Sequence, residues 1–174
     1  NSSVDCIAAD SGYHVPTEGS TGQEACPAGT YQNLTGQSEC MEVEPGHYTD
    51  SPASLQQSEC LAGTYQPNSG QTSCVDAQPG HYVSENGSTA QLPCPSGYYN
   101  PSTASSSFDA CTYADPGHFT DSEGAASQSE CTAGTYQSNS GQTACLESDP
   151  GYFVASTASI SQSPCLAGTY NPSK

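Results

Sequence analysis

The sequence has almost no positive charge. Its 174 residues include a single Lys and no Arg against 18 Asp and Glu, which gives a formal net charge of −17. Nucleic acids and anionic membrane surfaces are bound by clustered Lys and Arg, so the composition argues against both roles. No stretch approaches the ~18 apolar residues of a membrane-spanning helix, and we therefore expect no membrane insertion.

Residues that fill a hydrophobic core are also scarce. Hydrophobic residues make up 33% of the chain, Trp is absent, Met occurs once, and Gly and Pro number 17 and 13. Such a chain cannot offset its ordering entropy by core packing alone. Its ten cysteines offer a substitute, because disulfides replace a core in many secreted proteins. We therefore expect an extracellular or cell-surface protein.

Glycine marks a repeat that runs through the chain. One glycine recurs every 17 residues, apart from one interval of 20 residues between Gly97 and Gly117. An aromatic residue follows each of these glycines by two positions, except in the first copy, where His14 stands there. We expect the glycine to form a tight turn and the aromatic to be the main apolar side chain that each copy buries. The glycines are Gly12, Gly29, Gly46, Gly63, Gly80, Gly97, Gly117, Gly134, Gly151 and Gly168.

The cysteines alternate within this register, lying either three or six residues before the glycine. The repeating unit is therefore a pair of 17-residue halves. Gly-Gln pairs at Gly36, Gly70 and Gly141 indicate a second turn, and the few residues between turns leave room for short strands but not for a helix. The sequence predicts a small disulfide-rich fold, mostly irregular with short β-hairpins, arranged as an elongated tandem-repeat rod.

The repeat predicts one continuous array over residues 1–174. The unit at 94–130 is three residues longer than the others, and the extra residues fall in a Ser-rich stretch, 102–109, as expected for an insertion in a surface loop. We expect a partial first unit at 1–25, full units at 26–59, 60–93, 94–130 and 131–164, and a partial last unit at 165–174.

Two local disulfide pairings fit the cysteine spacing. Pairing across the shorter intervals gives Cys26–Cys40, Cys60–Cys74, Cys94–Cys111 and Cys131–Cys145, and leaves Cys6 and Cys165 single. Pairing across the longer intervals gives Cys6–Cys26, Cys40–Cys60, Cys74–Cys94, Cys111–Cys131 and Cys145–Cys165. Either set closes short loops, each worth roughly 3 kcal/mol in the chain-entropy description.

The segment Cys26-Pro27-Ala28-Gly29-Thr30-Tyr31 through Cys40 has copies at 60–74, 94–111 and 131–145. It resembles the cysteine-rich repeats of ephrin-receptor-like and tumour necrosis factor receptor-like ectodomains, over nearly the whole chain. The resemblance implies the pairing that encloses each Gly-x-aromatic loop, which is Cys26–Cys40 and its equivalents. This chain has one Cys per half and lacks the Cys-x-x-Cys pairs of those families, so the resemblance implies a rod of stapled modules.

The two ends of the sequence nearly preserve the repeat when residue 174 is followed by residue 1 of a second copy. We therefore expect head-to-tail self-association, with an intersubunit disulfide between Cys165 and Cys6. The first hypothesis is a structural subunit of an extracellular fibre or surface filament. The alternative is an ectodomain stalk or ligand-binding module of a cell-surface receptor, in which the sequence is a stretch of a longer repeat polypeptide.

Metal binding receives little support from the motifs. Cysteines at least 14 residues apart without a Cys-x-x-Cys pair predict no zinc site. His47, His81 and His118 share a Pro-Gly-His turn, where a hydrogen bond to nearby backbone is the main expectation and a ladder of metal-binding imidazoles the lesser one. Acidic residues recur before Cys and before Pro-Gly, and weak calcium association there is the alternative to a solvated acidic surface. These acids are Glu39, Glu59, Glu130, Glu44, Asp115 and Asp149.

Glycosylation is the most specific chemical signal after the repeat. Asn1, Asn33 and Asn86 begin Asn-x-Ser/Thr triplets, so we expect glycans there. An enzyme is not expected, because no His lies in a recognisable motif with a nucleophile and a stapled rod offers no deep pocket.

Overall fold

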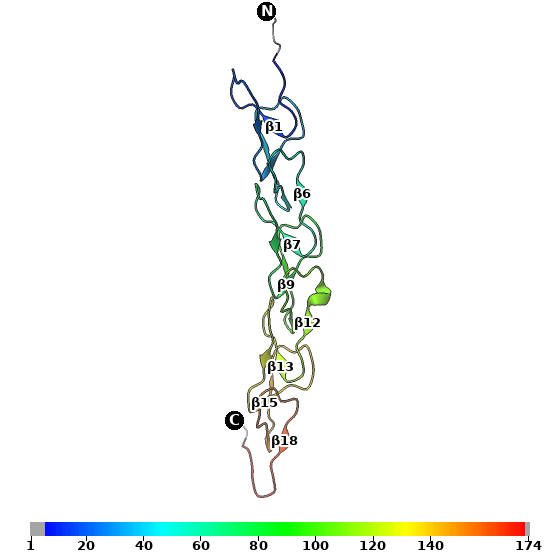
Figure 1. Cartoon of the computed structure of the whole chain (residues 1–174). Coiled ribbons are helices and arrows are strands. Elements are labelled where there is room, and N and C mark those ends of the chain that lie inside the picture. Colours follow the sequence, from blue (N-terminus) through cyan, green and yellow to red (C-terminus); the bar gives the residue numbers. More distant parts are fainter. Residues whose placement is uncertain (1–5, 173–174) are drawn as a thin grey trace, which may run out of the picture. The chain divides into compact units, whose positions relative to one another are not determined.

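The computed structural model describes residues 6–172, which form nine two-stranded antiparallel hairpins (Figure 1). Each hairpin corresponds to one copy of the glycine register. In chain order the paired strands are β1 (Tyr13–His14) with β2 (Glu24–Ala25), β3 (Thr30–Tyr31) with β4 (Met41–Glu42), β5 (His47–Tyr48) with β6 (Ser58–Glu59), β7 (Thr64–Tyr65) with β8 (Val75–Asp76), β9 (His81–Tyr82) with β10 (Leu92–Pro93), β11 (Tyr98–Tyr99) with β12 (Thr112–Tyr113), β13 (His118–Phe119) with β14 (Ser129–Glu130), β15 (Thr135–Tyr136) with β16 (Leu146–Glu147), and β17 (Tyr152–Phe153) with β18 (Ser163–Pro164). The predicted disulfide-rich fold with short hairpins is confirmed.

A tight turn introduces each hairpin. In the turn Glu44–His47 the His47 N–H donates to the Glu44 carbonyl at 3.1 Å, and Gly46 occupies the third position with a φ of 82°. A type II turn needs positive φ at that position, which only glycine adopts without strain, and it favours proline before it. The Pro-Gly sequence of this half is therefore a turn signal, and the glycines of the register have φ between 81° and 94°.

A second left-handed position recurs once per hairpin, in the loop between its two strands. Gly36, Gly70 and Gly141 have φ of 70°, 67° and 69°, in agreement with the second turn expected from the sequence. Alanine occupies the same register in three copies, and its φ is 51–55° there. The complete set is Gly19, Gly36, Ala53, Gly70, Gly87, Ala104, Gly124, Gly141 and Ala158.

Backbone hydrogen bonds join successive hairpins. The N–H of Gly46 donates at 2.7 Å to the carbonyl of Gln66 in the next hairpin, and Gly117 makes the same bond to Gln137 at 2.7 Å. The backbones approach so closely that a Cβ on Gly46 would overlap the carbonyl oxygen of Gly87. Glycine is therefore needed in this register both for its φ and for the space.

The buried core consists of two positions in each copy. The first lies three residues before the glycine and alternates between Cys and a small apolar residue. The second directly follows the aromatic and holds Val, Thr, Gln or Asn. Their members with at most 7% exposure are Ala9, Cys26, Val43, Cys60, Ala77, Cys94, Ala114 and Cys131, and Gln32, Thr49, Gln66, Val83, Asn100, Thr120, Gln137 and Val154.

The aromatics differ from our expectation, because Tyr31, Tyr48 and Tyr65 are half-buried and Phe153 is exposed. Backbones that meet at glycine leave room between the hairpins for small and medium side chains, so the rings lie at the edge of the core. The structure also adds a short 3-10 helix, η1 (Phe108–Ala110), inside the predicted Ser-rich loop, where no helix was expected.

Contacts divide the chain into two units, Asn1–Asp76 with Val83–Gln91 and Ala77–Tyr82 with Leu92–Lys174. Each unit contains the hairpin and disulfide pattern described above. The unit boundaries predicted from the repeat remain a prediction. Within residues 6–172, no helix has the length and apolar character needed to cross a bilayer.

Candidate functional site: the disulfide module

Four disulfides pair eight of the cysteines across the shorter intervals. The bonded pairs are Cys26–Cys40, Cys60–Cys74, Cys94–Cys111 and Cys131–Cys145, each with a Cα–Cα distance of 5.7 Å. Cys6 is an exposed free thiol and Cys165 a half-buried one. The predicted bridge between Cys165 and Cys6 of another chain remains a prediction.

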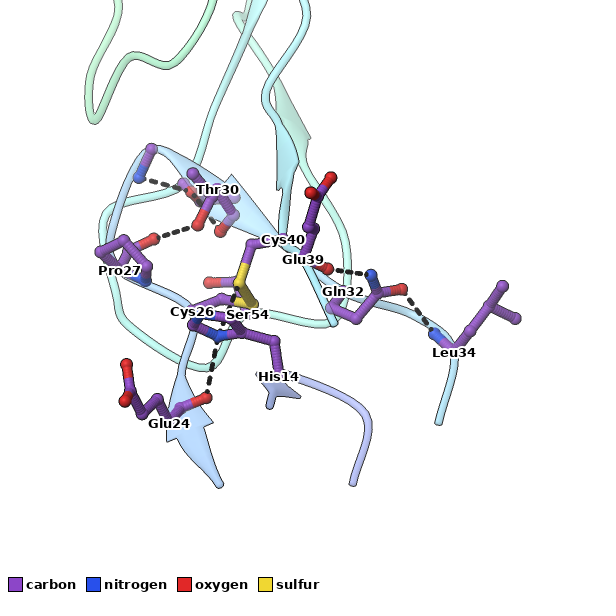
Figure 2. Close-up of a disulfide and its surroundings, with 12 residues drawn as sticks. His14, Glu24, Cys26, Pro27, Thr30, Gln32, Leu34, Glu39, Cys40 and Ser54 are labelled. Atoms are coloured by element: carbon purple, nitrogen blue, oxygen red, sulfur yellow. Dashed lines mark hydrogen bonds between the residues drawn. A yellow bond between two sulfur atoms is a disulfide. The ribbon is translucent and has the colours of Figure 1, made fainter. Parts of the chain in front are cut away.

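Each disulfide ties one hairpin to the next. Cys26 directly follows β2 and Cys40 directly precedes β4, so their bond fixes the end of the first hairpin against the second (Figure 2). The closed loop contains β3 and its turn. In this arrangement the sulfur atoms take the place that a hydrophobic core has in larger domains.

A buried amide organises the loop inside the module. Gln32 is 3% exposed, its Nε2 donates to the Glu39 carbonyl at 2.8 Å, and its Oε1 accepts from the Leu34 N–H at 3.0 Å (Figure 2). Gln66 and Gln137 make the equivalent bonds in their own loops. The sequence analysis missed these residues, although the repeated Thr-Tyr-Gln triplet at 30–32, 64–66 and 135–137 is a signal for them.

The longer module uses a different amide. Asn100 is 1% exposed, its Nδ2 donates to the Ser105 hydroxyl at 2.9 Å, and its Oδ1 accepts from the Ser102 N–H at 3.0 Å. Phe108 of η1 packs against Tyr98, with ring centroids 5.4 Å apart. A hydrogen bond with Tyr113 is the main cause that raises the pKa of Tyr98 above its usual range.

The histidines fall into two groups. In the Pro-Gly-His turns, the Nδ1 atoms of His47, His81 and His118 lie 3.2–3.3 Å from the carbonyl of the proline two residues earlier. This is the local hydrogen bond expected from the sequence. His14 differs, because its Nδ1 lies 3.2 Å from the Cys40 Sγ and 3.2 Å from the Glu24 carbonyl (Figure 2).

His14 thereby joins a group with the metal-ligand atom types. Its ring nitrogen and the sulfurs of Cys26 and Cys40 lie within 4.8 Å of one another. The sequence gave no sign of this group, because its members are 12 to 26 residues apart in the chain. A thiolate is the sulfur form that binds metal, and both sulfurs here belong to a disulfide. The group is therefore a site for sulfur chemistry in the oxidised protein.

The acids before the turns are held by reciprocal hydrogen bonds. The Asp115 N–H donates to the Gln128 Oε1, and the Gln128 Nε2 donates to the Asp115 carboxylate at 2.7 Å. Glu44 and Asp149 form the same pair with Gln57 and Gln162. These carboxylates serve the turn, so calcium association, which remains a prediction, would have to compete with the glutamine amides.

The predicted glycosylation sites lie in loops. Asn33 and Asn86 are both exposed, and the Asn86 Oδ1 accepts a hydrogen bond from the Ala62 N–H at 2.9 Å. Asn1 lies outside the described residues. Glycans at these positions remain a prediction.

Residues 12–60 match the family model described as tyrosine-protein kinase ephrin type A/B receptor-like. The matched segment contains the hairpins from β1 to β6 and the Cys26–Cys40 disulfide. The match agrees with the ephrin-receptor-like resemblance noted in the sequence. A search of curated proteins finds no match.

Proposed function

We propose that the chain is a non-enzymatic segment of an extracellular, receptor-type ectodomain, serving as a stalk or as a ligand-binding module. The match of residues 12–60 to an ephrin-receptor-like model is the observation that carries this proposal. The four disulfides support an oxidising, extracellular location, because the cytosol keeps thiols reduced.

The hydrogen-bonded hairpins support a role that depends on a maintained shape. In each module the disulfide and a buried Gln or Asn fix the same loop. Repeated units that contact mainly their neighbours derive their stability from the interfaces between successive units. This type of architecture suits a module that holds or presents a surface outside the cell.

The match supports the ectodomain interpretation better than the filament subunit that the sequence favoured first. Head-to-tail association remains a prediction that a non-reducing gel tests. A higher band that reductant converts to the monomer is expected if Cys165 bridges to Cys6 of another chain. A monomer band that reductant leaves unchanged would reject the bridge.

Location is the most direct test of the proposed function. Antibodies against the folded chain should stain intact, non-permeabilised cells of the source organism. Amine-reactive surface labels are unsuitable here, because the sequence has a single Lys. Staining that requires permeabilisation, alongside a cytosolic marker that behaves in the same way, would contradict the proposal.

A further inference from the structure

The Cys26–Cys40 disulfide has a neighbour that distinguishes it from the other three. His14 in β1 brings its Nδ1 to 3.2 Å from the Cys40 Sγ. The same position of the repeat holds Tyr48 before Cys60–Cys74, Tyr82 before Cys94–Cys111, and Phe119 before Cys131–Cys145. These rings have no nitrogen, so within the described residues this register places an imidazole against a single disulfide.

The geometry favours negative charge on the Cys40 sulfur. The His14 Nδ1 is equidistant, at 3.2 Å, from the Glu24 carbonyl oxygen and the Cys40 Sγ. An N–H at this position can donate to either atom. A thiolate carries a full negative charge and is the stronger acceptor, so the imidazole stabilises Cys40 once its disulfide bond has been broken.

Access points to the same sulfur. Cys26 is 0% exposed, whereas Cys40 is half-buried. A small thiolate therefore reaches the Cys40 Sγ before the Cys26 Sγ. The sulfur that reacts first is thus the one beside His14.

We propose that Cys26–Cys40 is the exchangeable disulfide of this chain, opened by small thiols more readily than the other three because His14 stabilises the Cys40 thiolate. In the first step, a reductant thiolate attacks the Cys40 Sγ, forms a mixed disulfide with it and releases the Cys26 thiolate. In the second step, a second reductant thiolate attacks the reductant sulfur of that mixed disulfide and releases the Cys40 thiolate against His14. The reductant is oxidised to its disulfide, two cysteines are reduced, and the two protons of the reductant thiols end on Cys26 and on the Cys40–His14 pair.

The test is an equilibrium measurement in glutathione redox buffers of increasing reducing strength. The folded chain is quenched with acid, its free thiols are alkylated, and each cysteine pair is quantified by mass spectrometry. We expect the equilibrium constant for reduction of Cys26–Cys40 to exceed that of Cys60–Cys74 by about tenfold. Equal constants for the two pairs would overturn the proposal.

Two variants separate the effect of His14 from the position of its module in the chain. His14→Tyr places in the first module the residue that Tyr48 supplies in the second, and it should remove the difference. Tyr48→His should make Cys60–Cys74 about tenfold easier to reduce. If Cys26–Cys40 stays equally labile with Tyr at position 14, or if His at position 48 has no effect, the role of the imidazole is wrong. Far-ultraviolet circular dichroism before reduction checks that each variant is folded.

Discussion

The loops closed by Cys60–Cys74 and by Cys94–Cys111 solve the same structural problem with different lengths. The second spans 17 residues in place of 14, yet both disulfides have a Cα–Cα distance of 5.7 Å. The backbone bond to the preceding hairpin is also the same, from Gly46 to Gln66 and from Gly80 to Asn100, at 2.7 Å in both. The insertion has changed the interior of the loop and left its attachments unchanged.

The change is visible in the buried amide. Gln66 reaches seven residues along the chain to the Ser73 carbonyl, whereas Asn100, one methylene shorter, reaches five residues to the Ser105 hydroxyl. The remaining length of the longer loop forms η1, where Phe108 contacts Tyr98 and Tyr82. The module is therefore defined by its fixed points, namely the disulfide, the glycine contact and a buried amide, and the loop between them varies.

Removal of the disulfides should have the largest effect, and it should affect both regions alike. We expect Cys60→Ala with Cys74→Ala, and separately Cys94→Ala with Cys111→Ala, to lower the free energy of unfolding by about 3 kcal/mol each. The two losses should agree within about 0.3 kcal/mol, because the entropy of loop closure depends only on the logarithm of loop length. Urea titration of the two double variants measures both. A much smaller loss in the longer loop would show that the two modules are not equivalent.

The glycine contact should have the next largest effect. A Cβ on Gly46 or Gly80 would overlap the carbonyl oxygen of Gly87 or Gly124, whereas a Cβ on Gly151 would meet nothing within 4 Å at a similar φ of 81°. Gly46→Ala and Gly80→Ala should each lower the urea midpoint by the equivalent of about 2 kcal/mol more than Gly151→Ala, which reports backbone strain alone. Equal losses in all three variants would mean that the close approach does not limit this position.

The buried amide should have a smaller effect that separates the two loops. Gln66→Asn shortens the side chain, so its amide no longer reaches the Ser73 carbonyl seven residues away. We expect the free energy of unfolding to fall by about 1 kcal/mol, because a buried carbonyl loses its partner. Gln56→Asn, at an exposed position, is the matched control and should change stability by less than about 0.5 kcal/mol. Equal stabilities of the two variants in urea would contradict the role of the amide.

The smallest effect concerns the second left-handed position. Gly70 in the shorter loop and Ala104 in the longer one occupy the same register, with φ of 67° and 51°. Ala104→Gly should stabilise the chain by about 0.5 kcal/mol by relieving strain, and Gly70→Ala should destabilise it by about 1 kcal/mol. Thermal unfolding followed by circular dichroism gives both shifts. Shifts of the same sign would contradict this account of the loop.

Much of the fold could be predicted from the register of one residue type. Glycine at fixed intervals marks a tight turn wherever a side chain would be strained, and the short stretches between turns allow only brief strands. The second turn was only partly recognised, because Ala53, Ala104 and Ala158 adopt left-handed φ values of 51–55° where glycine is the expected residue. Their φ depends on the hairpin that each loop contacts, which a local pattern does not show.

The candidate site was less predictable than the fold. Spacing alone allowed two disulfide pairings, and only the family resemblance favoured the observed one. The contact between His14 and Cys40 joins residues that lie in successive hairpins, so it depends on how those hairpins meet. The buried amides were missed because a hydrophobic pattern gives no weight to Gln32 or Asn100, although both are at most 3% exposed.

Disulfide mapping tests the central claim most directly, namely that each module is closed by its own disulfide. The natural protein, alkylated without reduction, would be digested with a protease specific for acidic residues and analysed by mass spectrometry. We expect linked peptides for Cys26–Cys40, Cys60–Cys74, Cys94–Cys111 and Cys131–Cys145. Peptides linking Cys40 to Cys60, or Cys74 to Cys94, would contradict the module and the account built on it.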